Sequence, residues 1–339
     1  MTDPELERRL GAAFDAAARA SVSDAASPPP ARFALEPAGR RRGRWLAPLA
    51  AAAAVVAVGA SMLALRGGND KPVPAAGAAS VRIQLATAGN QTYGVGMPVV
   101  AYFSRRFTSA RTLTAATSVT VNGSAAQAAW YFERSANRPG YPVEGHLRLD
   151  GFWPARSRVQ ISVASRDLPA GPGLRFADDV QLSFVTGPAV VAVVDDRTHR
   201  MSVTRDGKPI ASYPVALGAD ETPTSRGIKV IMQKDASVCL RGPGFHECGV
   251  KYAQQLTYSG EYLHAAPWNL TNIKIGRDTS NGCTNLLPAD AAALYKLLTV
   301  GDVVEYPDAG GPPMRLASGY GDWNIAWAVW QRGGLIPTT

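Results

Sequence analysis

The sequence predicts a mainly β protein in which two β-rich domains follow an N-terminal apolar segment. Between residues 81 and 187, short runs rich in branched and aromatic side chains alternate with turn residues, which indicates a β-sandwich. A second set of such runs begins at residue 190, and one main helix stands out near residues 288–298. A chain of 339 residues is long enough for two such domains and additional tails.

The composition is that of a globular protein. Hydrophobic residues make up 46% of the chain and charged residues 18%, which excludes disorder throughout. The net charge of +8 would suit an anionic partner such as nucleic acid, a membrane or a cell-wall polymer. Four of the arginines, however, lie within residues 40–44 beside the apolar segment, where membrane topology explains them better. The charge therefore gives little information about partners, and we expect no nucleic-acid partner.

The apolar segment spans residues 45–65 and contains no charged side chain. As a helix it would be about 30 Å long, the thickness of the hydrocarbon core of a bilayer. A transmembrane helix in the cytoplasmic membrane is therefore expected, with a cleaved signal or a soluble alanine-rich helix as the alternatives. The arginine distribution predicts that residues 1–44 form a cytoplasmic tail and that the chain after the linker at 66–80 lies outside, at the cell wall.

The first β-rich domain is expected at residues 81–187. It contains no cysteine, so its core must rest on Trp130, Phe132, Trp153 and branched aliphatic residues. His146 is interpreted as a residue on the surface of a strand. The strands are predicted at 99–103, 118–121, 129–132, 159–164 and 180–185.

The second domain is expected at residues 188–308. Its first two strands, 190–194 and 201–203, flank a hairpin turn at 195–198, and further strands are predicted at 210–217 and 228–232. The helix is predicted to begin at Pro288 and to end before Gly301, with its apolar stripe packed beneath the loop of a nucleophile. Residues 309–339 carry tryptophans at helical spacing and are expected to dock on this second domain.

Two of the three cysteines flank a turn-forming sequence. Cys239 and Cys248 lie on either side of Arg241-Gly242-Pro243-Gly244, which could bring two strand ends together. In an oxidising compartment a disulfide would restrict this loop, whereas two reduced thiols in a mobile loop remain the alternative. No spacing typical of zinc ligands is present, so we expect no metal site.

The chemistry is placed in the stretch from Tyr258 to Asn285, which holds the third cysteine. Cys283 follows Gly282, a residue that lets backbone N–H groups turn toward a bound carbonyl oxygen. A thiol is largely protonated at neutral pH and needs a base, and His264 lies in the same stretch. From spacing alone, a small buried cysteine and a hydrogen-bonded structural histidine are the commoner explanation of this pattern.

Four segments extend this pattern to a known family. The segments YSGEYLHAAPWN (258–269), SNGCTN (280–285), GDVVEY (301–306) and GDWNIAWAVW (321–330) resemble the L,D-transpeptidases of mycobacteria and their actinobacterial relatives. The resemblance runs from about residue 99 to residue 330, and HLRLDGFWPARSRVQISV (146–163) is similar to the domain before the catalytic domain in those enzymes. It implies an immunoglobulin-like β-sandwich followed by a YkuD-like β-sandwich catalytic domain, with the region between 222 and 252 as the active-site lid.

The resemblance also implies a mechanism that needs no cofactor. Cys283 would attack a carbonyl of a peptidoglycan stem peptide, and an amine from a second stem would take over the acyl group to give a 3→3 cross-link. His264 would serve as base and then as acid, oriented by the carbonyl of Ala265, and the N–H groups of Gly282 and Cys283 would form the oxyanion hole. The residues expected to contact the substrate are Tyr262, Trp268, Ser280, Asn281 and Asn285.

One position departs from the family motif S-H-G-C-x-N. Asn281 stands where the motif has histidine, and an amide cannot supply the positive charge of an imidazolium. We expect a working enzyme that depends on His264. The alternatives are a weak homologue that binds cell-wall peptide, a cysteine L,D-carboxypeptidase that passes the acyl group to water, and a membrane-anchored interaction protein that needs no thiol.

Overall fold

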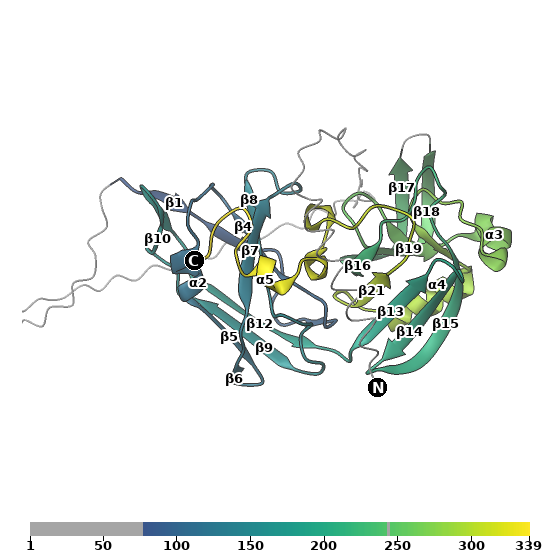
Figure 1. Ribbon diagram of the computed structural model, residues 1–339, viewed down its shortest axis with the longest axis horizontal. Helices are drawn as coiled ribbons and strands as arrows, with labels where there is room; N and C mark the ends of the chain where they lie inside the picture. Colours follow the sequence, from purple (N-terminus) through teal and green to yellow (C-terminus); the bar gives the residue numbers. More distant parts are fainter. Residues whose placement is uncertain (1–76, 243–244) are drawn as a thin grey trace, which may run out of the picture.

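The computed structural model of the protein describes residues 77–242 and 245–339. The predicted tail at 1–44, the predicted transmembrane helix at 45–65 and most of the predicted linker lie outside the described residues. Within the described ranges, every helix is too short or too polar to cross a bilayer. The described chain is mainly β, as expected, and Figure 1 shows its two β-rich parts side by side.

The N-terminal part is a sandwich of two sheets. The five-stranded sheet has the order β3-β12-β9-β5-β6 and the four-stranded sheet the order β2-β4-β8-β7, while β1, β11 and β10 form a small third sheet. The first sheet comprises β3 (Thr92–Tyr93), β5 (Thr117–Val121), β6 (Ser124–Ala125), β9 (Arg158–Val163) and β12 (Val180–Thr186). The second comprises β2 (Ile83–Leu85), β4 (Val99–Phe103), β7 (Ala129–Arg134) and β8 (Val143–Arg148). The remaining elements are β1 (Ala79–Val81), β10 (Pro169–Gly171), β11 (Leu174–Phe176) and α2 (Arg111–Ala115).

Alternating side chains hold these two sheets together. Along β12 and β9, every second residue is buried, and the buried faces of both sheets join in one hydrophobic cluster. The predicted core residues Trp130, Phe132 and Trp153 are all buried within it. The five strands predicted from the sequence are confirmed as β4, β5, β7, β9 and β12. In β9 and β12, the alternation of apolar and polar residues determines which face is buried.

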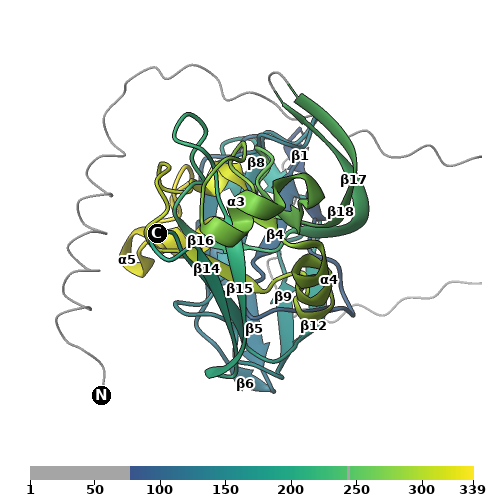
Figure 2. The same cartoon turned by 90° about the vertical axis from the view of Figure 1, so that its right-hand side faces the viewer.

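The catalytic part is built on a nine-stranded sheet with the order β16-β21-β13-β14-β15-β20-β19-β18-β17. Its neighbours are antiparallel except for β13 with β21 and β19 with β20. The strands are β13 (Val190–Asp195), β14 (Arg200–Arg205), β15 (Lys208–Ala216), β16 (Gly227–Val230), β17 (Gln233–Gly242), β18 (Phe245–Gln255), β19 (Tyr262–Ala265), β20 (Thr284–Leu286) and β21 (Val303–Tyr306). Figure 2 shows the long hairpin of β17 and β18 curving away from β14 and β15.

The predicted main helix is present as α4 (Pro288–Leu297), with Pro288 in its first turn. Ala291 and Leu294 are buried on its inner face and join Leu263 and Leu286 in the second hydrophobic cluster. The helix therefore packs against β19 and β20, beneath the nucleophile loop as expected. The short helices are α3 (Leu270–Ile275), α5 (Trp327–Trp330), η1 (Pro267–Asn269), η2 (Leu316–Ser318) and η3 (Asp322–Asn324).

The C-terminal segment does not dock on the catalytic domain alone, which corrects the sequence-based expectation. Asn324 contacts Ile228 of β16, but the chain then crosses to the N-terminal sandwich, where Gly334 pairs with Phe132 and Ile336 joins the core. In Figure 1 this segment, drawn in yellow, runs from the catalytic part back across the sandwich. It therefore ties the two parts of the molecule together.

The three tryptophans of this segment surround one arginine of the sandwich. The guanidinium of Arg148 on β8 lies 4.9, 5.4 and 4.3 Å from the ring centroids of Trp323, Trp327 and Trp330. It also donates to the carbonyl of Ile325 at 2.6 Å. The rings share a side, but not on the single helix that their spacing predicted, because Trp323 lies in η3 and the other two in α5, with an extended Ile325 between them. The buried cation that they cover belongs to the other domain.

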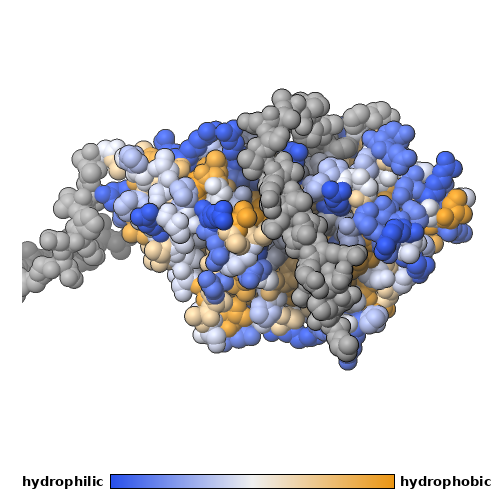
Figure 3. Space-filling model, viewed as in Figure 1, coloured by the Kyte–Doolittle hydropathy of each residue, from blue (hydrophilic) through white to orange (hydrophobic). Residues whose placement is uncertain are grey.

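His146 is buried, not exposed on a strand as the sequence suggested. Its Nδ1 lies 2.8 Å from Asp322 Oδ1 and its Nε2 2.9 Å from Glu144 Oε1, because the C-terminal segment covers β8. Burial alone would lower the pKa of His146, but the charges of Asp322 and Glu144 raise it. Glu133 lies opposite Glu144 in the strand pair, and burial raises its pKa to about 8. Much of the surface shown in Figure 3 is hydrophilic, whereas this junction buries charges.

This junction should make the protein less stable in alkaline solution. Glu133 and His146 have higher pKa values in the folded than in the unfolded state, so the folded protein binds more protons. Stability is then lost as the pH rises, for Glu133 between 4.5 and about 8. Glu133→Gln should raise the unfolding free energy by about 1 kcal/mol near pH 9 and change little near pH 5. Thermal unfolding across pH measures this.

The exposed Glu221→Gln serves as the control, because it removes a carboxylate without touching the junction. Equal pH dependence of melting in wild type and Glu133→Gln would contradict the assignment.

Candidate active site

Cys283 and His264, the candidate nucleophile and base, come together because two neighbouring strands run in parallel. Cys283 directly precedes β20, His264 lies on β19, and the register pairs Leu263 with Thr284 and His264 with Asn285. Residues that are 19 positions apart in the sequence are thereby brought to the same end of two adjacent strands. Both side chains are buried, Cys283 at 8% and His264 at 3% exposure.

His264 is held in one tautomer by its own main chain. Its Nδ1 lies 3.0 Å from the carbonyl oxygen of Ala265, and a carbonyl only accepts, so Nδ1 carries the proton. The other ring nitrogen, Nε2, is then free to act as a base. Complete burial lowers the pKa of His264 to about 4, so the ring is uncharged at neutral pH.

Cys283 rests as a neutral thiol. Its Sγ donates to the carbonyl oxygen of Gly260 at 3.4 Å. Burial raises the pKa of the thiol to about 12, against the lowering effect of a hydrogen bond from the Tyr262 backbone. The resting site is therefore an uncharged thiol and an uncharged imidazole, not an ion pair. For Cys283 to ionise, the thiol proton must leave its hydrogen bond to the Gly260 carbonyl and pass to a base.

The turn before the nucleophile is closed by Ser280. Its hydroxyl accepts from the Gly282 N–H at 3.2 Å and donates to the Cys283 carbonyl at 2.6 Å. Gly282 has a φ of +99°, a conformation that side chains rarely adopt, and its carbonyl accepts from Thr224 Oγ1 at 3.0 Å. Ser280, expected to contact substrate, thus shapes the turn. Because the Gly282 N–H is engaged, the Cys283 N–H is the remaining candidate of the two predicted oxyanion donors.

The predicted residues surround one pocket of about 320 Å³. Gly282 and Ala265 contribute backbone groups outside its lining. Trp268 is 56% exposed, and its ring stacks on His264 at 5.9 Å between centroids. Asn285 is buried, and its side-chain oxygen has no hydrogen-bond partner among the described residues. The predicted residues that line the pocket are Tyr262, His264, Trp268, Ser280, Asn281, Cys283 and Asn285.

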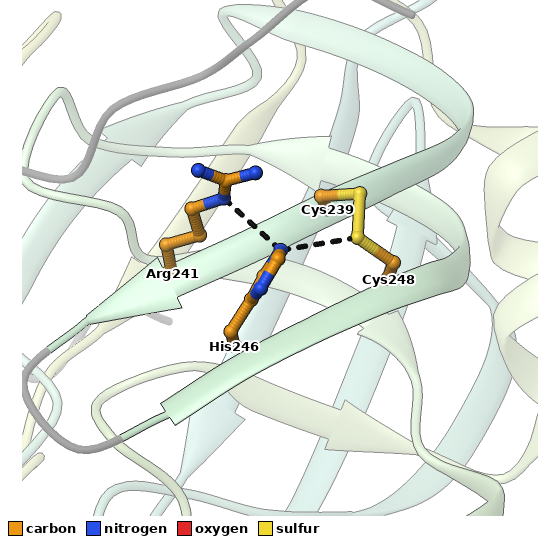
Figure 4. Close-up of a disulfide and its surroundings, with 4 residues drawn as sticks. All are labelled: Cys239, Arg241, His246 and Cys248. Carbon is orange, nitrogen blue, oxygen red and sulfur yellow. Dashed lines mark hydrogen bonds between the residues drawn. A yellow bond between two sulfur atoms is a disulfide. The ribbon is translucent and has the colours of Figure 1, made fainter.

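The hairpin of β17 and β18 forms one wall of this pocket, where the sequence suggested a lid. A disulfide joins Cys239 on one strand to Cys248 on the other. His246 Nε2 lies 3.2 Å from Cys248 Sγ and accepts from Arg241 Nε at 3.0 Å (Figure 4). The two cysteines and His246 bring ligand atoms within 4.8 Å, but cysteine binds metals as a thiolate and both sulfurs are in the disulfide.

The other wall is formed by η1 and α3, where sequence reasoning named Trp268 but missed Asn269 and Asn272. Asn269 Nδ2 donates to Thr279 Oγ1 at 2.9 Å, and Asn272 Nδ2 donates to Asn269 Oδ1 at 2.7 Å, so all three pocket residues are joined. The helix ends at Gly276, whose φ of +67° is typical of a helix C-terminus. Pro267 and Gly276 mark both ends of this helical stretch, and that punctuation was the available signal.

Comparison with known proteins agrees with this geometry. Residues 189–305 match the family model of the L,D-transpeptidase catalytic domain, named YkuD. L,D-transpeptidase 2 of Mycobacterium tuberculosis is 31% identical over 252 residues, which cover 72% of this chain and 60% of that protein. Residues 189–305 are therefore similar to the catalytic domain of YkuD-type L,D-transpeptidases.

Solved structures support the same family beyond the catalytic domain. An L,D-transpeptidase from Mycobacterium smegmatis has a TM-score of 0.53 and 27% identity, covering 67% of this chain and 99% of that chain. An L,D-transpeptidase in complex with imipenem has a TM-score of 0.54 and 26% identity, covering 69% of this chain and all of that chain. The chain spans about 60% of the length of the curated relatives that it matches.

The disulfide should contribute to stability by limiting the unfolded chain. Replacing both Cys239 and Cys248 with serine should lower the unfolding free energy by about 2.5–3 kcal/mol, because a short closed loop is opened. Denaturant unfolding of the two forms measures this difference. Reduced wild-type protein is the matched control and should resemble the serine variant. A variant as stable as the oxidised wild type would contradict the prediction.

Proposed function

We propose that the protein is a cysteine-dependent L,D-transpeptidase that forms 3→3 cross-links in peptidoglycan. The observation that carries this proposal is that Cys283 and an unprotonated Nε2 of His264 meet in one pocket of an L,D-transpeptidase catalytic domain. The donor is a tetrapeptide stem, and the attacked carbonyl belongs to its third residue. No metal or organic cofactor is needed for acyl transfer by a thiol.

The first half of the reaction forms an acyl-enzyme. Cys283 Sγ attacks the carbonyl carbon while its proton passes to His264 Nε2, and the oxyanion accepts a hydrogen bond from the Cys283 N–H. His264 then gives the proton to the departing D-alanine amine. Because burial opposes charge on both groups, attack and proton transfer proceed together, without a stable thiolate–imidazolium pair.

The second half transfers the acyl group to an acceptor. The side-chain amine of the third residue of another stem attacks the thioester, and His264 accepts its proton. The C–S bond then breaks, and His264 returns the proton to the departing Cys283 sulfur. Asn285 offers a buried, unpaired carbonyl oxygen to an N–H of the bound peptide, and the exposed face of Trp268 offers an apolar surface at the pocket rim. If water replaced the amine, the same site would act as an L,D-carboxypeptidase.

The proposed location is outside the cytoplasm. A disulfide in the active-site wall supports an oxidising compartment. In this proposal the N-terminal sandwich is an immunoglobulin-like spacer, and residues 45–65 hold the protein in the cytoplasmic membrane with residues 1–44 inside.

Imipenem gives a direct test of the nucleophile, since an L,D-transpeptidase structure contains this compound. Mass spectrometry of the wild type should reveal one covalent adduct, lost in Cys283→Ser and His264→Ala. A hydroxyl is far harder to deprotonate than a thiol, and an unassisted thiol with a pKa of about 12 is almost fully protonated at neutral pH. Incubation with tetrapeptide stems, with and without an acceptor amine, separates cross-linking from hydrolysis.

Folding of the variants is checked by their melting curves, with Glu221→Gln, an exposed residue outside the pocket lining, as the variant that keeps the adduct. An adduct of wild-type yield on Cys283→Ser would refute the assignment of the nucleophile.

A weaker enzyme is the second candidate, favoured by the exposed Asn281 at the position of the motif histidine and by the raised pKa of Cys283. Asn281→His should speed acylation by imipenem by less than tenfold, about 1 kcal/mol, because His264 already supplies the base. Stopped-flow acylation rates measured across pH test this. A gain of about a thousandfold or more would mean that the native protein is a crippled enzyme.

A further inference from the structure

A buried ion pair lies beside the nucleophile. Lys229 on β16 has 0% exposure, and its Nζ lies 2.6 Å from Oε2 of Glu261, the residue directly before β19. Removing two charges from water costs more free energy than their mutual attraction returns, unless further hydrogen bonds satisfy both groups. The position of such a pair therefore invites a functional explanation.

The carboxylate of this pair is fully engaged. Glu261 Oε1 accepts from the Ser225 N–H at 2.8 Å, and Oε2 accepts from the Ser225 hydroxyl at 2.8 Å in addition to Lys229. The ammonium of Lys229 also lies 3.9 Å above the ring of Tyr306. The Tyr306 hydroxyl and Thr284 Oγ1 are 2.7 Å apart. A continuous buried network thus links the pair to the residue that follows Cys283.

Glu261 sits between the two backbone groups that contact the sulfur. The carbonyl of Gly260 accepts from Cys283 Sγ, and the backbone N–H of Tyr262 donates to it. The side chain of Glu261 also packs beside Gly282, where an added Cβ would lie 3.7 Å from its Cγ. Anchoring Glu261 therefore fixes the backbone on both sides of the thiol.

The charges around the sulfur oppose one another. Burial raises the pKa of Cys283, as does the charge of Glu261, whereas the Tyr262 backbone and the charge of Lys229 lower it. His264 is uncharged at neutral pH, because burial lowers its pKa to about 4. The titratable groups around the sulfur on β16, on β19 and the residue before it, and on β21 are Lys229, Glu261, Tyr262, His264 and Tyr306. The β17–β18 hairpin adds Arg241 and Glu247 to the lining of the same pocket.

We propose that Lys229 and Glu261 are a positioning pair for the nucleophile. Glu261 holds the 260–262 backbone against the sulfur, and Lys229 both anchors Glu261 and places a positive charge beside Cys283. The neutral Asn281 cannot supply such a charge. The proposal rests on Cys283 being the nucleophile of the proposed function, but it concerns how the thiol ionises.

The test follows the ionisation of Cys283 without any substrate. The chain has three cysteines and two form the disulfide, so iodoacetamide alkylation of the oxidised protein reports on Cys283 alone. Lys229→Met should slow alkylation about tenfold at each pH near neutrality, where the thiol is mostly protonated; this loss of thiolate corresponds to a midpoint of the alkylation–pH profile about one unit higher. Glu261→Gln should move it down by about one unit, because the ammonium then acts unopposed.

Opposite shifts separate this role from a merely structural one, since general loosening of the site would move both variants in the same direction. Lys234→Met is the matched control, because its Nζ contacts the carbonyls of Tyr295 and Leu298 on α4 and just after it. Its midpoint should remain that of the wild type. Shifts in the same direction for both variants, or no shift in either, would overturn the proposal.

Further variants keep the test decisive if a single charge change prevents folding. Lys229→Arg keeps the charge and should keep the midpoint. The double variant Lys229→Met/Glu261→Gln leaves no unpaired charge and should titrate near the wild type, but imipenem acylation should fall about tenfold as the 260–262 backbone loses its anchor. A Lys229→Arg midpoint one unit higher, or a double variant that acylates at the wild-type rate, would contradict the proposal. Absence of an imipenem adduct on wild type would instead refute the proposed function and leave these midpoints unaffected.

Discussion

The parallel pairing of β19 with β20 is the constraint on which the active site depends. It aligns His264 with Asn285 and sets Cys283 at the entrance of β20. Parallel strands need a long connection, and here the connection supplies η1 and α3, which form one wall of the pocket. Helix α4 shares one hydrophobic cluster with both strands. One pairing therefore positions the nucleophile, the base and part of the binding surface.

Burial of this site determines how its chemistry must proceed. Both reacting groups are enclosed, which suppresses the charged forms that a solvated thiol and imidazole could adopt. The same low dielectric strengthens every nearby charge and hydrogen bond. Small changes in the surrounding charges, such as those of Lys229 and Glu261, are thus felt strongly at the sulfur. Burial therefore makes both groups harder to ionise while it encloses them in the pocket proposed for acyl transfer.

The C-terminal segment links this site to the N-terminal sandwich. It covers Arg148 and His146 on β8. Both side chains are buried, and each finds a hydrogen-bond partner in the segment. The carbonyl of Ser318 in the same segment accepts from the Tyr258 N–H at 2.7 Å. Tyr258 is two residues from Gly260, which contacts the thiol. The segment that docks on the sandwich thus also contacts the loop whose Gly260 carbonyl binds the Cys283 thiol.

The sequence by itself determined the strands, the main helix and the identities of Cys283 and His264. Alternating apolar residues and a helix start at Pro288 are local patterns that the sequence contains. Cys283 and His264 lie within one short stretch of the chain. Only the tertiary structure decided which charged side chains are buried and which partners they meet. His146 appeared as a surface residue and Lys229 as an ordinary strand residue, because their partners Asp322 and Glu261 are distant in sequence. Burial of a charge depends on what the fold lays over it, and no local pattern contains that information.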